Sequence, residues 1–270
     1  MRHFSTTLAA LAATLLLPPA APADAAFRGN LFGAVGAFDT MTTYDQAYLA
    51  RIDANTGVLS PLASGYDFIN GVDYEIQGGT VRDGIYYTVA TPADADTGFT
   101  VVWNRFDLAA RRWLEPISFG YHPEVMAYSM TYNASNDKFY VLGLDPGASE
   151  FSYLSIVDAR TWEITVVGRF NDGGFLAGIA YCPVDGFVYI LGQNNYLYRF
   201  DEEDGDISNV GQATRDYALV SENRATAFTY SPLDHAFVAV YIDNENEQFN
   251  LAFIDSDTYD TVLTPALSPE

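Results

Sequence analysis

The feature that most constrains the fold is a short segment that recurs five times and ends each time in an aspartate. The five copies read YLARID, VWNRFD, YLSIVD, YLYRFD and LAFID, and they end at Asp53, Asp107, Asp158, Asp201 and Asp255. Successive aspartates are 54, 51, 43 and 54 residues apart. A repeat of this length is typical of the blades of a β-propeller or of a repeat array.

Two positions in each copy are always apolar, which indicates a buried layer between stacked sheets. The residues four places before each aspartate are Leu49, Trp103, Leu154, Leu197 and Leu251, and those directly before it are Ile52, Phe106, Val157, Phe200 and Ile254. The aspartates themselves are predicted to form Asx-turns that start a final hairpin, because a turn glycine follows Asp53 and Asp201 four residues later. A shared catalytic role for all five is not expected.

The clearest complete unit runs over residues 176–212 and is expected to hold four strands joined by three turns. Those strands are predicted at 177–181, 187–191, 196–200 and 207–210. Asp-Gly pairs mark two of the turns, since glycine tolerates positive φ and aspartate bonds its own backbone. The sequence therefore predicts an all-β fold, a β-propeller of about five four-stranded blades. The approximate blade limits are 26–64, 65–118, 119–170, 171–212 and 213–270.

The first predicted blade is incomplete. Leu31 to Ala37 aligns with the second strand of the other units, and no innermost strand precedes it in the chain expected after removal of a leader. The C-terminal tail, Thr264 to Glu270, is the alternative source of a strand, although Pro265 and Pro269 disfavour a regular one. Both an open first blade and one completed by the tail remain compatible with the sequence.

The N-terminus has the order of a secretory signal peptide, predicted over residues 1–25. Arg2 supplies a basic start, Leu8 to Leu17 is apolar, and Ala23 and Ala25 flank a small-x-small cleavage site. The apolar stretch is shorter than the roughly 20 residues that cross a bilayer, and no later segment is long enough. The expected location is secreted, either periplasmic or extracellular, with residues 26–270 as the propeller domain.

The net charge excludes some classes of partner, and the cysteine count excludes an intrachain disulfide. The chain carries 35 acidic and 13 basic residues, for a net charge of −22. Such a field repels nucleic acid and anionic membranes, so neither is an expected partner. Cys182 is the single cysteine, which excludes an intrachain disulfide. It is expected to be a small buried apolar residue.

The repeat units resemble those of secreted repeat propellers of the NHL, kelch and YVTN types. The likeness is carried by Asn70 to Tyr74, by Gly178 to Gly186 and by the run Leu197-Tyr198-Arg199-Phe200-Asp201, and it covers nearly all of residues 26–270. It is similar in particular to exported bacterial domains without an assigned activity. The resemblance implies a propeller fold and an exported binding or array protein. It does not imply a reaction.

Candidate ligand-binding residues lie in the loops that join successive blades, because loops on a rigid scaffold are the usual place of function in propellers. They combine aromatic, acidic and basic side chains: Tyr66, Asp67, Tyr121, His122, Glu124, Asp172, Glu222 and Arg224. Such a mixture suits a protein partner, a polar small molecule or a glycan. Ordinary solvated loops are the alternative interpretation. No catalytic residue is assigned, although His122 has the chemistry of a base.

No cofactor or metal is assigned, and calcium is left open. Carboxylates gather in several loops, at Asp94, Asp96, Asp145, Asp243, Glu245 and Glu247, but the glutamate that closes an EF-hand is absent. Asn133 to Ser135 is a glycosylation sequon. The sequence thus favours a secreted, non-catalytic binding or scaffold propeller. The alternative is a propeller hydrolase, lactonase or cyclotransferase acting at the channel mouth, since such enzymes assemble their sites from scattered residues.

Overall fold

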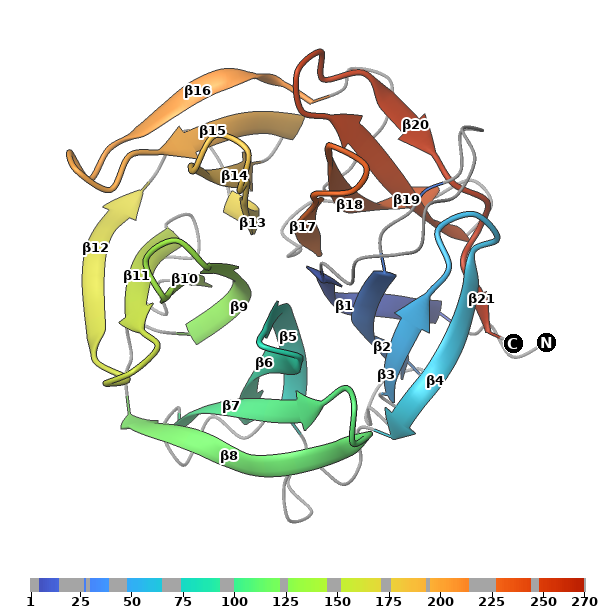
Figure 1. Ribbon diagram of the computed structural model, residues 1–270, viewed down its shortest axis with the longest axis horizontal. Coiled ribbons are helices and arrows are strands. Elements are labelled where there is room, and N and C mark those ends of the chain that lie inside the picture. Colours follow the sequence, from blue (N-terminus) through green and yellow to red (C-terminus); the bar gives the residue numbers. More distant parts are fainter. Residues whose placement is uncertain are drawn as a thin grey trace.

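The structure is a computed structural model that describes residues 5–14, 27, 30–38, 48–64, 74–92, 100–121, 126–144, 152–170, 176–192, 195–213, 227–243 and 248–269. These residues form five sheets arranged around a central axis, as in a propeller (Figure 1). The predicted all-β class and the five-bladed arrangement are confirmed. Within the described part of the chain, no helix has the length and apolar character needed to cross a membrane.

The strands follow the order of the chain from one blade to the next. The first blade holds β1 (Ser5–Thr14), β2 (Asn30–Phe38), β3 (Tyr48–Ile52) and β4 (Val58–Ser64), and the second holds β5 (Tyr74–Arg82), β6 (Ile85–Pro92), β7 (Thr100–Asp107) and β8 (Arg112–Tyr121). The third holds β9 (Met126–Asn133), β10 (Lys138–Leu144), β11 (Ser152–Asp158) and β12 (Ile164–Phe170), and the fourth holds β13 (Leu176–Tyr181), β14 (Val188–Gly192), β15 (Tyr196–Phe200) and β16 (Ile207–Gln212). The fifth holds β17 (Phe228–Ser231), β18 (Ala236–Asp243), β19 (Gln248–Asp255) and β20 (Thr261–Leu263), and the short β21 (Ser268–Pro269) follows.

Each blade is an antiparallel meander whose first strand lies nearest the axis and whose fourth strand lies at the outer rim (Figure 1). The second strands are apolar on both faces because each sheet packs against a neighbour on either side. In β14, for example, all five residues are buried. Five separate hydrophobic clusters fill the five junctions between adjacent blades, including the junction of the fifth blade with the first. Side-chain packing therefore closes the ring.

The prediction of an incomplete first blade is wrong for the full chain. Residues Ser5 to Thr14 form β1, which pairs antiparallel with β2 and supplies the innermost strand. These residues belong to the predicted signal peptide, so export with cleavage after Ala25 would remove this strand. The strand that the sequence left unidentified thus comes from residues 1–25, which the predicted cleavage would remove before folding.

The C-terminal tail also joins the first blade, but at the outer edge and not at the predicted inner edge. Ser268 and Pro269 pair in parallel with Val58 and Leu59 of β4, at the outer rim. Before that, the tail bonds to the fifth blade, where Leu267 N–H donates to the Phe249 carbonyl at 2.6 Å. The tail thus ties the last blade to the first. Only two residues pair, which agrees with the expectation that the prolines limit a regular strand.

The repeated aspartates form the predicted Asx-turns. In all five blades the carboxylate accepts backbone N–H groups of the turn that follows, as in Asp158, whose Oδ1 accepts from Arg160 and Thr161 at 2.8 and 2.9 Å. These donors favour the ionised carboxylate and lower the pKa of Asp158 and of Asp255. The apolar columns are buried as predicted, with every member at most 2% exposed.

Candidate functional site

The predicted ligand-binding residues belong to the segments that join successive blades, and the structure describes little of these segments. Tyr121 is the last residue of β8. The other seven, Tyr66, Asp67, His122, Glu124, Asp172, Glu222 and Arg224, lie outside the described residues. Of the calcium candidates, Asp243 ends β18 and the remainder also lie outside. Within the described segments, no group of three or more His, Cys, Asp or Glu side chains is arranged to hold a metal ion.

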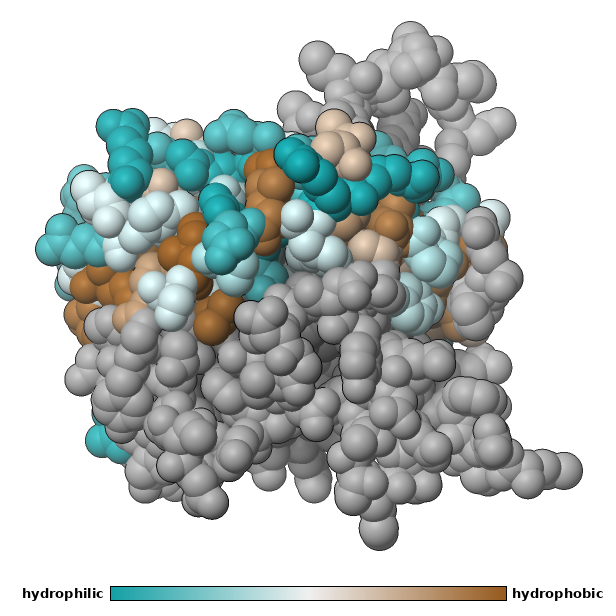
Figure 2. All heavy atoms as spheres, turned by 90° about the horizontal axis from the view of Figure 1, so that it is seen from below, coloured by the Kyte–Doolittle hydropathy of each residue, from teal (hydrophilic) through white to brown (hydrophobic). Residues whose placement is uncertain are grey.

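A groove of about 510 Å³ opens between the outermost strand of the second blade and the start of the outermost strand of the third. We call it the Trp162 groove. It is lined by Ile117, Ser118 and Phe119 of β8, by Trp162 and Glu163 of the turn before β12, and by Ile164, the first residue of β12. Figure 2 views the molecule from the side of β8 and shows apolar residues beneath a hydrophilic rim. The groove has a size and a lining common in small-ligand sites, with aromatic walls and few polar groups.

Trp162 stands at a special position of the Asx-turn. The residue four places after each repeated aspartate has a positive φ, between 52° and 74°, and these residues are Gly57, Arg111, Trp162, Gly205 and Tyr259. Glycine is the ordinary choice for such a backbone, and a bulky residue there is uncommon. In the third blade, the turn is closed by the Trp162 N–H, which donates to the Asp158 carbonyl at 2.8 Å. Trp162 thus adopts a backbone conformation that is unfavourable for a bulky residue, and its indole lies at the junction of the second and third blades.

An aromatic floor supports the groove. Trp103, which is 1% exposed, meets Phe119 at 5.0 Å and Trp162 at 5.9 Å between ring centroids, both edge to face. Phe139 stacks on Trp162 with centroids 5.9 Å apart and planes inclined by 18°. Such ring pairs add stability beyond the area they bury, and they restrict the rotamers of the rings. The floor therefore holds Trp162 in place while the groove leaves part of it open.

An ion-pair network next to the groove fixes the turn that carries Trp162. Asp137 receives Arg82 from the second blade at 2.9 Å and Arg160 from the Trp162 turn at 2.9 Å. The Tyr132 hydroxyl donates to the same carboxylate at 2.8 Å. The hydrogen bonds from Tyr132 and Arg160, together with the two positive charges, lower the pKa of Asp137. The network joins the second and third blades and orients Arg160, which lies two residues before Trp162.

This network predicts an acid dependence of stability. A carboxyl group with a lowered folded-state pKa stabilises the fold above its unfolded pKa, about 3.9 for aspartate, and loses that contribution as the pH falls through the folded value. We therefore expect Asp137→Asn to be less stable than the natural chain at pH 7 and equally stable near about pH 2. Urea unfolding at several pH values measures both. A stability difference that stays constant from pH 7 to about pH 2 would show that ionisation of Asp137 is not the source.

Similar polar bridges join the third and fourth blades. Glu202 accepts hydrogen bonds from Lys138, Tyr140 and Asn136. Burial raises the pKa of Glu202, but the hydrogen bonds from Lys138 and Tyr140 outweigh it, and the net shift is downward. Glu202 follows Asp201 in the fourth Asx-turn, and in the third Asx-turn the Ala159 carbonyl accepts a hydrogen bond from Arg82 of the second blade at 3.2 Å. Polar groups in the Asx-turns of two blades thus bond to the preceding blade, and these bonds help to hold neighbouring blades together.

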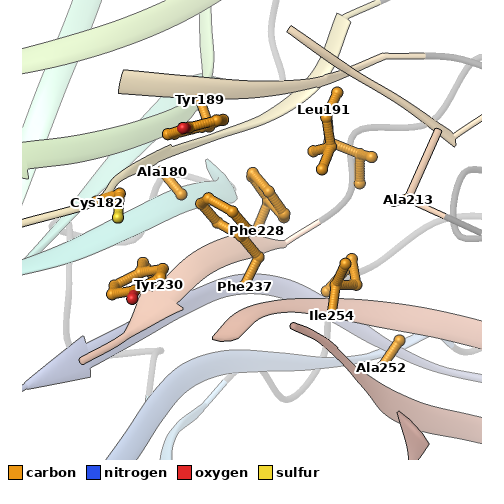
Figure 3. Close-up of a cluster of buried hydrophobic side chains, with 12 residues drawn as sticks. Ala180, Cys182, Tyr189, Leu191, Ala213, Phe228, Tyr230, Phe237, Ala252 and Ile254 are labelled. Carbon is orange, nitrogen blue, oxygen red and sulfur yellow. The ribbon is translucent and has the colours of Figure 1, made fainter. Parts of the chain in front are cut away.

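The junction of the fourth and fifth blades contains the single cysteine. Cys182 is 2% exposed and belongs to the same buried cluster as Tyr189 and Tyr230 (Figure 3). Burial raises the pKa of the Cys182 thiol and raises that of Tyr230 to about 12. The prediction of a small buried apolar residue is confirmed. The sequon residue Asn133 is also buried, and its side-chain oxygen accepts the Ser135 hydroxyl at 2.7 Å, so a glycan would have to displace it from the core.

The comparisons with known proteins support the fold alone. No family model and no curated protein matches the sequence. A protein of unknown function from Bacteroides thetaiotaomicron VPI-5482 is similar in structure, with a TM-score of 0.50, 12% identity, and coverage of 91% of this chain and 59% of its own. An oligogalacturonate lyase in complex with manganese gives a TM-score of 0.45 at 16% identity over 87% and 62%. YCF48 bound to D1 peptide gives 0.46 at 8% identity over 97% and 68%. The chain spans about three fifths of the length of the first two structures.

Sequence reasoning missed the Trp162 groove, although one signal was present. Aligning the aspartates also aligns the residue four places later, where the chain has glycine in the first and fourth units, arginine in the second, tryptophan in the third and tyrosine in the fifth. A bulky side chain at a position that prefers glycine is a sign of a special role. The partner of Trp162 could not be found in this way, because Phe119 belongs to the preceding unit.

Proposed function

We propose that the chain is an exported, non-catalytic binding propeller that holds an uncharged oligosaccharide, or a polar small molecule of similar shape, in the Trp162 groove. The single observation that carries this proposal is the pair of aromatic rings, Phe119 and Trp162, which line a groove of about 510 Å³. The export of the chain rests on the predicted signal peptide.

The lining of the groove suits such a ligand. The C–H faces of a sugar ring are apolar and pack on aromatic faces, while its hydroxyl groups need polar partners. Glu163 offers an exposed carboxylate and Ser118 an exposed hydroxyl beside the rings. The net charge of −22 disfavours polyanionic ligands, so a neutral ligand fits better than an acidic one.

The predicted loop residues extend this proposal. Tyr121, His122 and Glu124 follow Phe119 by two to five residues along the chain, directly after β8. We propose them as further contacts for a ligand that is longer than the groove. Asp172 follows the far end of β12, whose start lines the groove, so it is a candidate for the inter-blade loops and not for the groove.

A matched set of variants tests the groove. Glycine occupies the Trp162 position in the first and fourth blades and tyrosine occupies it in the fifth, so Trp162→Gly and Trp162→Tyr preserve a turn that the chain already uses. On an array of neutral oligosaccharides, we expect Trp162→Gly to weaken the natural chain's binding by about 30-fold, as loss of an aromatic anchor does. Trp162→Tyr should retain most of the affinity.

Tyr259→Gly is the control, because it makes the same kind of change at the same turn position of the fifth blade. It should leave affinity unchanged. A natural chain that binds no neutral oligosaccharide, or equal weakening by Trp162→Gly and Tyr259→Gly, would refute the placement of the site. Chemical conversion of a bound sugar would instead favour the alternative, a hydrolase, lactonase or cyclotransferase.

A further inference from the structure

The innermost strand of the first blade has an unusual origin. Strand β1 runs antiparallel to β2 from the pair Ser5 and Phe38 to the pair Thr14 and Asn30. It lies between β5 and β17, the innermost strands of the two neighbouring blades (Figure 1). Its sequence, STTLAALAAT, has no charged residue and is part of the predicted signal peptide. One segment is therefore both a predicted leader and a structural strand.

Removal of β1 would open one edge of β2 and leave β2 itself in place. Leu31 and Phe32 are 0% and 6% exposed, and they pack into different clusters, against the fifth and the second blade respectively. Strand β3 continues to pair with the other edge of β2. A row of backbone N–H and C=O groups on the inner edge would then need new partners. An apolar, uncharged edge of this kind readily adds a strand from another chain.

At two junctions, between the second and third blades and between the third and fourth, hydroxyl groups join the innermost strands. Thr80 of β5 accepts the Tyr132 N–H of β9 at 3.1 Å. In the next junction, Ser129 and Thr131 of β9 accept the N–H groups of Ile179 and Tyr181 of β13 at 3.1 and 2.9 Å. In each case the hydroxyl belongs to one blade and the N–H to the following blade. This bond satisfies a backbone N–H on the inner edge of the following blade, which points to the preceding blade and not to its own sheet.

The strand register transfers this pattern to the first blade. Ala13 pairs with Leu31, which pairs with Ile52. Tyr132 pairs with Phe139, which pairs with Val157, and Val157 and Ile52 both directly precede a repeated aspartate. The positions of Ala10 and Ala12 in β1 therefore correspond to those of Ser129 and Thr131. Alanine at these two positions cannot form the hydroxyl bond, as Gly178 and Ala180 at the same positions of β13 cannot, so a strand with Ser or Thr there would gain a bond that β1 lacks.

We propose that the inner edge of β2 is a strand-acceptor site, filled by Ser5–Thr14 in the full chain and, after cleavage at Ala25, by an extended segment of a partner protein. The partner segment runs antiparallel to β2, is uncharged and built of small and apolar residues, and has Ser or Thr at the positions of Ala10 and Ala12. This inference rests on the export part of the proposed function and is independent of the Trp162 groove.

Hydrogen exchange on two forms of the protein tests the proposal. Alternate amides of an antiparallel strand point to opposite neighbours, so loss of β1 should free about half of the β2 amides. We expect these to exchange at least about 100-fold faster in the chain that begins at Ala26 than in the full chain, with β14 as an unchanged reference. A synthetic peptide of residues 5–14 should restore protection. Equal protection of β2 in both forms would overturn the proposal.

Peptide variants test the recognition chemistry. Ala12→Thr in the peptide should strengthen binding by about 5-fold, the effect of one added hydrogen bond. Leu11→Pro should abolish binding, because proline lacks the N–H and distorts a paired strand. Equal affinity of all three peptides would show non-specific binding and overturn the proposal.

A second measurement covers the case in which the shortened chain does not fold. Ala10 and Ala34 face each other across β1 and β2, so Ala10→Cys/Ala34→Cys in the full chain should form a disulfide and then exclude the peptide. Failure of this pair to crosslink in the folded chain would overturn the proposal. N-terminal sequencing of secreted material should return Ala26. A start at Met1 would show that the export proposal fails. Failure of the peptide to bind the β2 edge would instead show that the strand-acceptor proposal fails.

Discussion

Replacing Leu197 with alanine is expected to lower the free energy of unfolding by about 2–4 kcal/mol, as large-to-small changes in a packed core do. Leu197 is fully buried in the cluster between the fourth and fifth blades. It belongs to the apolar column that all five blades share, and β15 is bounded by β14 and β16. The surrounding sheets are therefore held on several sides and cannot easily close over the lost volume.

Urea unfolding of the natural chain and of Leu197→Ala measures this loss. Val262→Ala is the control, because Val262 is 58% exposed on the outermost strand of the fifth blade. Its effect should stay within about 0.5 kcal/mol, the scale of a surface substitution. If Leu197→Ala fell within the same limit, the column would not be the buried layer that the structure shows.

Replacing Gly57 with alanine is expected to destabilise the chain by about 2–4 kcal/mol through two separate costs. Gly57 has a φ of 74°, a backbone conformation that disfavours any side chain. A Cβ atom there would lie 2.3 Å from the Ala266 carbonyl oxygen in the C-terminal tail. Since that oxygen belongs to the backbone, the tail itself must move, and the pairing of β21 with β4 is then weakened.

Gly84→Ala separates the two costs. Gly84 has a nearly equal φ of 76°, but nothing lies within 4 Å of an added Cβ. It should therefore show the backbone cost alone, about 1–2 kcal/mol. We expect Gly57→Ala to be worse by at least about 1 kcal/mol and to speed exchange of the Leu267 amide, which bonds to Phe249. Equal losses, with Leu267 still protected, would show that the tail does not depend on its seat beside Gly57.

Strand β1 and the C-terminal tail cover the two edges of the first blade. The outer edge, at β4, is covered by the C-terminal tail, and the inner edge, at β2, is covered by β1. The first blade therefore contains both terminal strands of the ring, with the C-terminal tail at its outer edge and the proposed acceptor site at its inner edge. Removal of β1 would take away its contacts with β5 and β17, whereas the pairing of β21 with β4 does not involve β1.

The amino-acid sequence by itself determined the blades and their turns. Local chemistry is enough for these features: an aspartate bonds the N–H groups of the next few residues, as Asp158 does, and a hydrophobic column repeats because each sheet packs between two others. The burial of the column residues, from Leu49 in the first blade to Leu251 in the fifth, follows from the same pattern. Such signals are contained within one unit or recur at a fixed spacing, so they can be read without knowing which units touch.

The tertiary structure alone decided what lies between units. The Trp162 groove needs Phe119 of one blade and Trp162 of the next, 43 positions later in the chain, and no local pattern joins them. The tail beside Gly57 and the strand β1 beside β2 also depend on segments far apart in sequence. A strand edge accepts any compatible backbone, so composition does not reveal its occupant. Only the closed ring brings the N-terminal strand to the edge that it fills.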